Sequence, residues 1–166
     1  TNGAMHGLYI LFRALLDAGD EVILPDPMWT EVAENVRLSG GTPVPVRLDP
    51  DHGYQYDVAA IEAAVTPRTK ALFVNTPHNP TGSVASIETL TALSECAARH
   101  DLMLVSDEAY EHVLFDGRTH VSLGSLPAAH GRTISVYSMS KTYAMSGLRL
   151  GYLAALARVE RVVAGD

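Results

Sequence analysis

Short apolar runs alternate with amphipathic helical patterns along almost the whole chain, and this alternation constrains the fold more than any other feature. Helices are predicted over residues 4–17, 31–38, 58–65 and 86–100, and strands over 21–24, 43–48, 70–75, 102–106, 133–137 and 150–156. Two prolines within 43–48 indicate an edge strand. The alternation predicts one α/β domain over residues 1–166, with a mainly parallel sheet and helices on both faces in three α/β/α layers.

Polar side chains collect where three of the predicted strands end. Residues 75–79 follow one strand, residues 107–110 follow the next, and residues 138–141 follow a third. Parallel α/β sheets bind ligands beyond the carboxyl ends of their strands. We therefore expect these three segments to meet in a single site.

The overall charge and composition exclude some classes of partner. The formal net charge of −7 makes nucleic acid an unexpected partner, because phosphate backbones need a basic protein face. No apolar run approaches the roughly 18 residues of a membrane helix, so no membrane partner is predicted. The lone Cys96 cannot form an internal disulfide, which favours a cytoplasmic location.

Lys141 lies among small hydroxyl residues directly after a predicted strand, and Arg149 follows eight residues later. At such a position we expect the lysine to be partly desolvated. Desolvation makes a lysine lose its proton more readily, so that it becomes a nucleophile able to form Schiff bases. Upstream, Asp107 and Tyr110 supply the groups that a pyridine-based cofactor would need.

Asp107 also has plainer interpretations. With Glu108 it resembles the acidic strand end that holds Mg²⁺ in P-loop proteins, but the chain lacks the Gly-x-x-x-x-Gly-Lys-Ser/Thr loop of such proteins. The His-Glu-x-x-His, Cys-x-x-Cys and Gly-x-Ser-x-Gly motifs are absent as well, and no metal site is predicted. A structural role for Asp107, capping the turn that follows it, stays open.

Three segments, taken in this order, resemble the class I/II aminotransferases of the fold-type I, pyridoxal-phosphate-dependent family. They are residues 75–82 (Asn-Thr-Pro-His-Asn-Pro-Thr-Gly), residues 106–110 (Ser-Asp-Glu-Ala-Tyr) and residues 138–152, which include Ser138, Lys141 and Arg149. Trp29 and the opening residues 1–5 also fall where that family would have them. The resemblance covers essentially the whole chain, and the combination of segments is specific where each one alone is not.

The resemblance implies roles in binding pyridoxal 5'-phosphate. Lys141 would form the Schiff base with the cofactor and later carry a proton between the substrate's α-carbon and the cofactor. Asp107 would pair with the pyridine nitrogen and keep it protonated. Tyr110 and Asn79 would hydrogen-bond the ring's phenolic oxygen, and Trp29 would stack on the ring face.

The resemblance also implies a cup for the cofactor's phosphate. The backbone N–H groups of Ala4 and Met5, at the start of the first helix, would form an anion site. Gly3 would let the backbone come close, because it carries no side chain. Ser138 and Arg149 would complete the cup, with Arg149 forming two charge-assisted bonds.

The family further implies an aminotransferase that moves an amino group between an amino acid and a 2-oxo acid, as a homodimer in its full-length form. Residues 1–166 would then be its large, cofactor-binding domain, without the terminal parts that build the small domain and supply an arginine for the substrate carboxylate. His78 stands where many relatives carry asparagine or glycine, and we expect it at the pocket rim without a catalytic role.

Alternatives on the same residues stay open. A pyridoxal-phosphate-dependent lyase or synthase, such as a carbon–sulfur lyase or an aminocyclopropane-carboxylate-synthase-like enzyme, would share Asp107, Lys141 and Arg149. Trp29, within Asp-Pro-Met-Trp, favours the aminotransferase. A non-catalytic cofactor-binding fragment, a regulatory domain, or an α/β binding protein without pyridoxal phosphate are the remaining interpretations.

Overall fold

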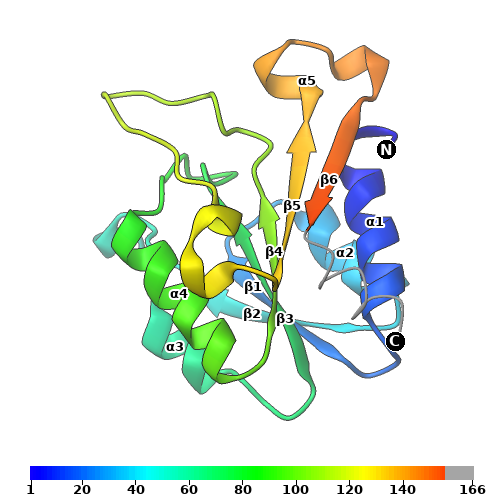
Figure 1. Cartoon of the computed structure of the whole chain (residues 1–166), viewed down its shortest axis with the longest axis vertical. Coiled ribbons are helices and arrows are strands. Elements are labelled where there is room, and N and C mark those ends of the chain that lie inside the picture. The colour runs from blue at the N-terminus through cyan, green and yellow to red at the C-terminus, as the bar shows by residue number, and fades with distance from the viewer. Residues whose placement is uncertain (156–166) are drawn as a thin grey trace.

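A six-stranded sheet forms the centre of the molecule (Figure 1), in the computed structural model that describes residues 1–155. Its strands are β1 (Glu21–Asp26), β2 (Thr42–Arg47), β3 (Thr69–Asn75), β4 (Met103–Asp107), β5 (Thr133–Ser138) and β6 (Gly151–Ala155), in the order β2-β1-β3-β4-β5-β6. Strands β1 to β5 are parallel, and β6 pairs antiparallel with β5. The predicted mainly parallel sheet is therefore confirmed, and β2 lies at an edge as its prolines predicted.

Helices cover both faces of this sheet. They are α1 (Gly3–Leu15), α2 (Thr30–Leu38), α3 (Val58–Ala63) and α4 (Ile87–Arg99). The short α5 (Met139–Thr142) lies beyond the end of β5 (Figure 1). Helices α1 and α2 lie on one face, and α3 and α4 lie on the other (Figure 1). Asp57 caps α3 by accepting a hydrogen bond from the Ala60 N–H, and Ser86 caps α4 by accepting one from the Thr89 N–H. The three α/β/α layers are confirmed.

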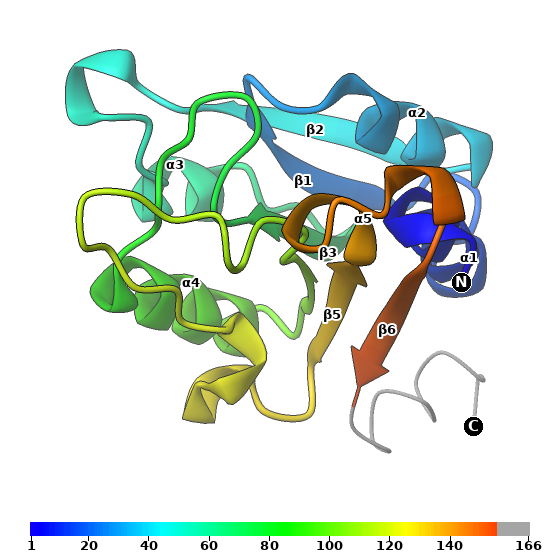
Figure 2. The same cartoon turned by 90° about the horizontal axis from the view of Figure 1, so that it is seen from above.

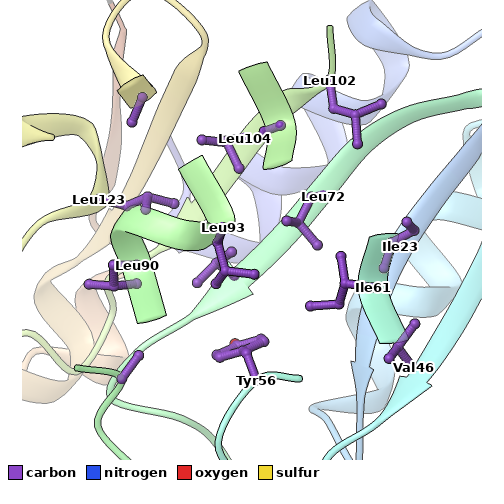
Figure 3. Close-up of a cluster of buried hydrophobic side chains, with 14 of the residues drawn as sticks. Ile23, Val46, Tyr56, Ile61, Leu72, Leu90, Leu93, Leu102, Leu104 and Leu123 are labelled. Atoms are coloured by element: carbon purple, nitrogen blue, oxygen red, sulfur yellow. The ribbon is translucent and has the colours of Figure 1, made fainter. Parts of the chain in front are cut away.

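Two apolar cores result, because neighbouring residues in a strand point to opposite faces. Val22 and Leu24 pack with α1 and α2, whereas Ile23 between them packs with α3 and α4. Figure 3 shows the second core, in which Leu72 of β3 faces Leu93 of α4. Burial on both faces holds the central strands rigidly, so the loops at their ends have fixed starting points.

The helix and strand bounds differ from the predictions by a few residues. Helix α1 ends at Leu15, because the backbone at Leu16 is already extended. Strand β4 includes Asp107, which was predicted to follow the strand. The segment between β4 and β5 contains only two 3₁₀ turns, Leu123–Ser125 and Pro127–Ala129. Of the strand predicted over 150–156, residue 156 lies outside the described residues.

One edge of the sheet gathers the ends of β3, β4 and β5 together with α5 and the start of α1, as seen from above in Figure 2. Gly151 in β6 allows this close approach. A Cβ at Gly151 would lie 2.7 Å from the Tyr137 oxygen and 2.8 Å from the Ala4 nitrogen, both backbone atoms. Within residues 1–155, no helix has the length and apolar character needed to cross a membrane.

Candidate active site

A cavity of about 350 Å³ opens beyond the carboxyl ends of β3, β4 and β5. It is lined by Ala4, Met5, Trp29, Asn75, Asn79, Asp107, Ala109, Tyr110, Ser138, Ser140, Lys141, Ser146 and Arg149. The three polar segments predicted to meet at the strand ends all contribute to it. Its volume falls within the range of sites for small ligands and cofactors. Every predicted site residue lines this cavity except Gly3, which lies directly beside the Arg149 guanidinium.

Asp107 ends β4 and presents its carboxylate to the cavity. Removal from bulk water raises the pKa of Asp107 to about 6; the backbone N–H of Ala109 opposes this rise, and the negative charge of Glu108 adds to it. Oδ1 of Asp107 accepts one hydrogen bond, from the Ala109 N–H at 3.1 Å. Asp107 therefore caps the next turn, as its plainer interpretation predicted. A cationic partner would relieve the unfavourable environment of the charged carboxylate.

Asn75 joins the ends of β3 and β4 behind the cavity. Its Nδ2 donates to the Asp107 carbonyl at 3.0 Å, and its Oδ1 accepts from the Asn79 N–H at 2.8 Å. The buried Tyr56 hydroxyl holds the Asn75 backbone by donating to its carbonyl at 3.0 Å and accepting from its N–H at 2.9 Å. These bonds fix Asn79 and Asp107 relative to each other.

Lys141 lies on α5, one turn beyond β5, with its Nζ 5.4 Å from the centre of the Tyr110 ring. This contact joins the loop after β4 to α5 across the cavity. The expectation of a partly desolvated lysine is wrong for the described residues, since the Lys141 side chain is exposed. Ser138, Ser140 and Ser146 line the same cavity as the lysine.

The other end of the cavity is an anion-binding arrangement. Arg149 donates from Nη1 to Ser140 Oγ and to the Ser146 carbonyl, both at 3.2 Å. Ser138 Oγ accepts from the Ser140 N–H at 3.2 Å. A Cβ on Gly3 would lie 2.4 Å from the Arg149 guanidinium, and Gly3 has a φ of +75° that favours glycine. The first N–H groups of α1 and a guanidinium thus converge, which suits a phosphate.

Two other residues of the motifs have different surroundings. The Trp29 side chain lines the cavity and is 48% exposed, a large exposed aromatic surface that a ring could cover. His78 is buried at 3% exposure, does not line the cavity, and has its Nδ1 within 2.8 Å of Thr81 Oγ1. Burial lowers the pKa of His78 to about 4. Contrary to the expected rim position, His78 lies inside the turn that carries Asn79.

Sequence reasoning missed four lining residues: Asn75, Ala109, Ser140 and Ser146. All four fall within the quoted motifs, so a signal for them was present. Asn75 is the hydrogen-bonded bridge between two loops, and Ser140 orients Arg149. Ser146 acts through its backbone carbonyl, which no side-chain pattern reveals.

The family model described as aminotransferase class I and II matches residues 1–165. The chain belongs to this family. The family uses pyridoxal phosphate. Over 152 residues the chain is 49% identical to a probable aspartate/prephenate aminotransferase of Thermus aquaticus, covering 92% of this chain and 39% of the relative. Over 154 residues it is 44% identical to the aspartate aminotransferase of Geobacillus stearothermophilus, with coverage of 92% and 39%.

Solved structures agree with this membership. The aspartate aminotransferase of Thermus thermophilus, in a structure with maleate, has a TM-score of 0.92 and 44% identity over 99% of this chain and 42% of that chain. The N-succinyldiaminopimelate aminotransferase of Mycobacterium tuberculosis has a TM-score of 0.93 and 36% identity over 99% and 43%. The chain thus spans about two-fifths of the length of these aminotransferases.

Proposed function

We propose that this chain is the large, cofactor-binding domain of an aminotransferase that uses pyridoxal phosphate to move an amino group from an amino acid to a 2-oxo acid. The single observation that carries the proposal is the convergence of Asp107, Lys141 and Arg149 on one cavity. Each supplies a different requirement: a carboxylate for a pyridinium, an amine for an aldehyde, and a guanidinium for a phosphate.

The residues present fit pyridoxal phosphate. Asp107 has a raised pKa and a single hydrogen bond at Oδ1, so a protonated ring nitrogen would be a favourable partner for its carboxylate. Trp29, Asn79 and Tyr110 line the same cavity and offer a stacking face and polar groups. When bound, the cofactor withdraws electrons from the substrate's α-carbon and so makes its proton removable.

The chain's own residues would do three things. The α1 N–H groups with Ser138 and Arg149 would bind the phosphate and set the depth of the cofactor. Asp107 would hold a proton on the pyridine nitrogen. Lys141 Nζ, free to move because its side chain is exposed, would carry a proton to and from the substrate.

The expected partners are small molecules, an amino acid and a 2-oxo acid. The relatives named above act on different amino donors by their names, and the donor for this protein is proposed only as that class. A homodimer of the full-length protein in the cytoplasm completes the proposal.

Isotope transfer tests this function directly. The full-length protein, loaded with pyridoxal phosphate, is incubated with a panel of ¹⁵N-labelled amino acids and an unlabelled 2-oxo acid. Appearance of ¹⁵N in the acceptor-derived amino acid is the expected result. Release of ammonia or pyruvate without an acceptor would instead favour the lyase, and no reaction with any donor would contradict both.

A further inference from the structure

Glu108 follows Asp107 in the chain but points to the opposite face of the sheet, and it is buried at 1% exposure. Within the strands, Ser106 Oγ of β4 donates to Glu108 Oε1 at 3.1 Å, and Ser135 Oγ of β5 donates to the same oxygen at 2.9 Å. The Glu108 N–H also donates to the Val136 carbonyl at 2.9 Å. The residue is thus held firmly between β4 and β5.

Further donors reach Glu108 from the chain that follows β4 and from Tyr137 of β5. His120 Nε2 lies 2.8 Å from Oε2, and Ser122 Oγ donates to Oε1 at 2.9 Å. The Tyr137 hydroxyl adds a longer bond of 3.4 Å to Oε2. Burial by itself would raise the pKa of Glu108, but the hydrogen bonds from His120, Ser122 and Ser135 outweigh burial and lower it. The carboxylate is therefore satisfied as an anion.

Residues 109–122 form a long loop that leaves β4 and leads to the 3₁₀ turns, of which Pro127–Ala129 packs beside α4 (Figure 1). It has no helix or strand of its own among residues 109–122, and residues 115–119 are all exposed. A loop of this length without internal structure needs anchors to keep one conformation. His120 and Ser122 bring the far end of the loop back to its start through the Glu108 carboxylate.

Tyr110 lies in the first turn of this loop. The Glu108 carbonyl accepts from the Glu111 N–H at 3.1 Å, and the Tyr110 carbonyl accepts from the Val113 N–H at 2.8 Å. The position of Tyr110 in the cavity therefore depends on the residues that fix both ends of the loop. Glu108 contributes at both ends, because it directly precedes the loop and its carboxylate binds His120 and Ser122 near the loop's far end.

We propose that Glu108 is a positioning residue: by collecting donors from β4, β5 and the returning loop, it fixes the 109–122 loop and so places Tyr110 in the cofactor cavity. It touches neither cofactor nor substrate and acts through Tyr110. The inference rests on the proposed function for the role of Tyr110, but the anchoring of the loop itself is a property of the chain.

Hydrogen exchange on the cofactor-free, full-length protein tests the anchoring. Glu108→Gln keeps the shape but removes the charge that attracts the donors. We expect amide exchange in residues 109–121 to accelerate by roughly tenfold or more. The matched control is Glu21→Gln, since Glu21 is 5% exposed, accepts from Thr66 and Arg68, and lies at the amino-terminal end of β1, away from the cavity. Glu21→Gln should leave exchange in 109–121 unchanged.

A double-mutant cycle on cofactor affinity tests the action through Tyr110. With the dissociation constant of pyridoxal phosphate as the readout, Glu108→Gln should weaken binding by roughly tenfold in the parent protein. The same change should have an effect of less than about twofold in the Tyr110→Phe protein, because residues that act as a unit are not additive. Glu21→Gln should combine additively with Tyr110→Phe.

The outcomes separate the two proposals. A parent protein that fails to bind pyridoxal phosphate contradicts the proposed function, while the exchange experiment still judges the anchoring. Binding by the parent together with unchanged loop exchange, or with additive effects, overturns the role of Glu108. If Glu108→Gln does not fold, Ser122→Ala removes a single loop-side donor, and the same two measurements apply with Thr66→Ala as its control.

Discussion

Asp107 and Glu108 are neighbours in the chain, but they occupy opposite environments on the two faces of the sheet. Asp107 faces the cavity, has one hydrogen bond to its carboxylate, and has its pKa raised to about 6. Glu108 faces away from the cavity, accepts from two strands and a loop, and has its pKa lowered.

The difference separates a group held ready for a ligand from a group that holds the fold. A carboxylate with few donors in a desolvated place is destabilising until a cation arrives, whereas one with many donors stabilises the elements that supply them. On the face with the cavity, the charged Asp107 carboxylate is therefore destabilising. On the opposite face, the hydrogen bonds to the Glu108 carboxylate stabilise the ends of the same strands.

Lys141→Ala should have the largest effect on activity and little effect on folding. Loss of the nucleophile and proton carrier should lower the transamination rate of the full-length protein by about 10⁴-fold or more. The Lys141 side chain is exposed, so the thermal midpoint of the cofactor-free protein should not change. Lys70→Ala is the control, because Lys70 is the other lysine of this chain and is also exposed. Equal losses in both variants would contradict the assignment.

Glu108→Ala should destabilise the fold, because it removes the carboxylate that accepts these hydrogen bonds. Removing one member of a buried charged network leaves its donors without partners, so we expect a loss of about 3–5 kcal/mol in the free energy of unfolding. Urea denaturation of the cofactor-free protein measures it. A loss below about 1 kcal/mol would mean that the network holds little of the fold.

Asp107→Asn should act in the opposite direction on stability. Burial raises the folded-state pKa to about 6, so between pH 4 and 6 the folded state binds more protons than the unfolded state, and stability falls as pH rises. The variant lacks this loss and should be more stable than the parent at pH 7, by about 1–3 kcal/mol, in the cofactor-free form.

The measurement for Asp107→Asn is the difference between variant and parent across pH. His78, whose pKa is lowered to about 4, makes stability rise with pH between about 4 and 6.5, and this contribution cancels in the difference. The difference should grow from pH 4 to 6 and then stay level. A variant less stable than the parent at pH 7 would refute the account of Asp107.

Gly3→Ala should have the smallest effect. The positive φ of Gly3 and the 2.4 Å approach of a Cβ to Arg149 require the guanidinium to move. We expect affinity for pyridoxal phosphate to fall by roughly tenfold, the factor that corresponds to about 1.4 kcal/mol. Fluorescence titration provides the measurement, and Gly19→Ala, which also has positive φ but meets no atom within 4 Å, is the matched control.

Periodicity predicted the layers, the edge strand and the strand ends that build the site, because buried parallel strands read as apolar runs. The roles of Asp107 and Lys141 came from motif resemblance rather than from pattern alone. The exposure of Lys141 and the burial of His78 were missed, since both depend on packing between loops that no local pattern specifies. The Glu108 network was missed for the same reason: its five side-chain partners come from β4, from the loop that follows it and from β5.

The most direct test of the central claim is a peptide map of the full-length protein after incubation with pyridoxal phosphate and reduction with borohydride. Reduction traps an amine joined to the aldehyde as a stable adduct. We predict the added mass on the peptide that contains Lys141 and none on the peptide that contains Lys70. Modification of Lys70, or no modification of Lys141 in protein that binds the cofactor, would contradict the account.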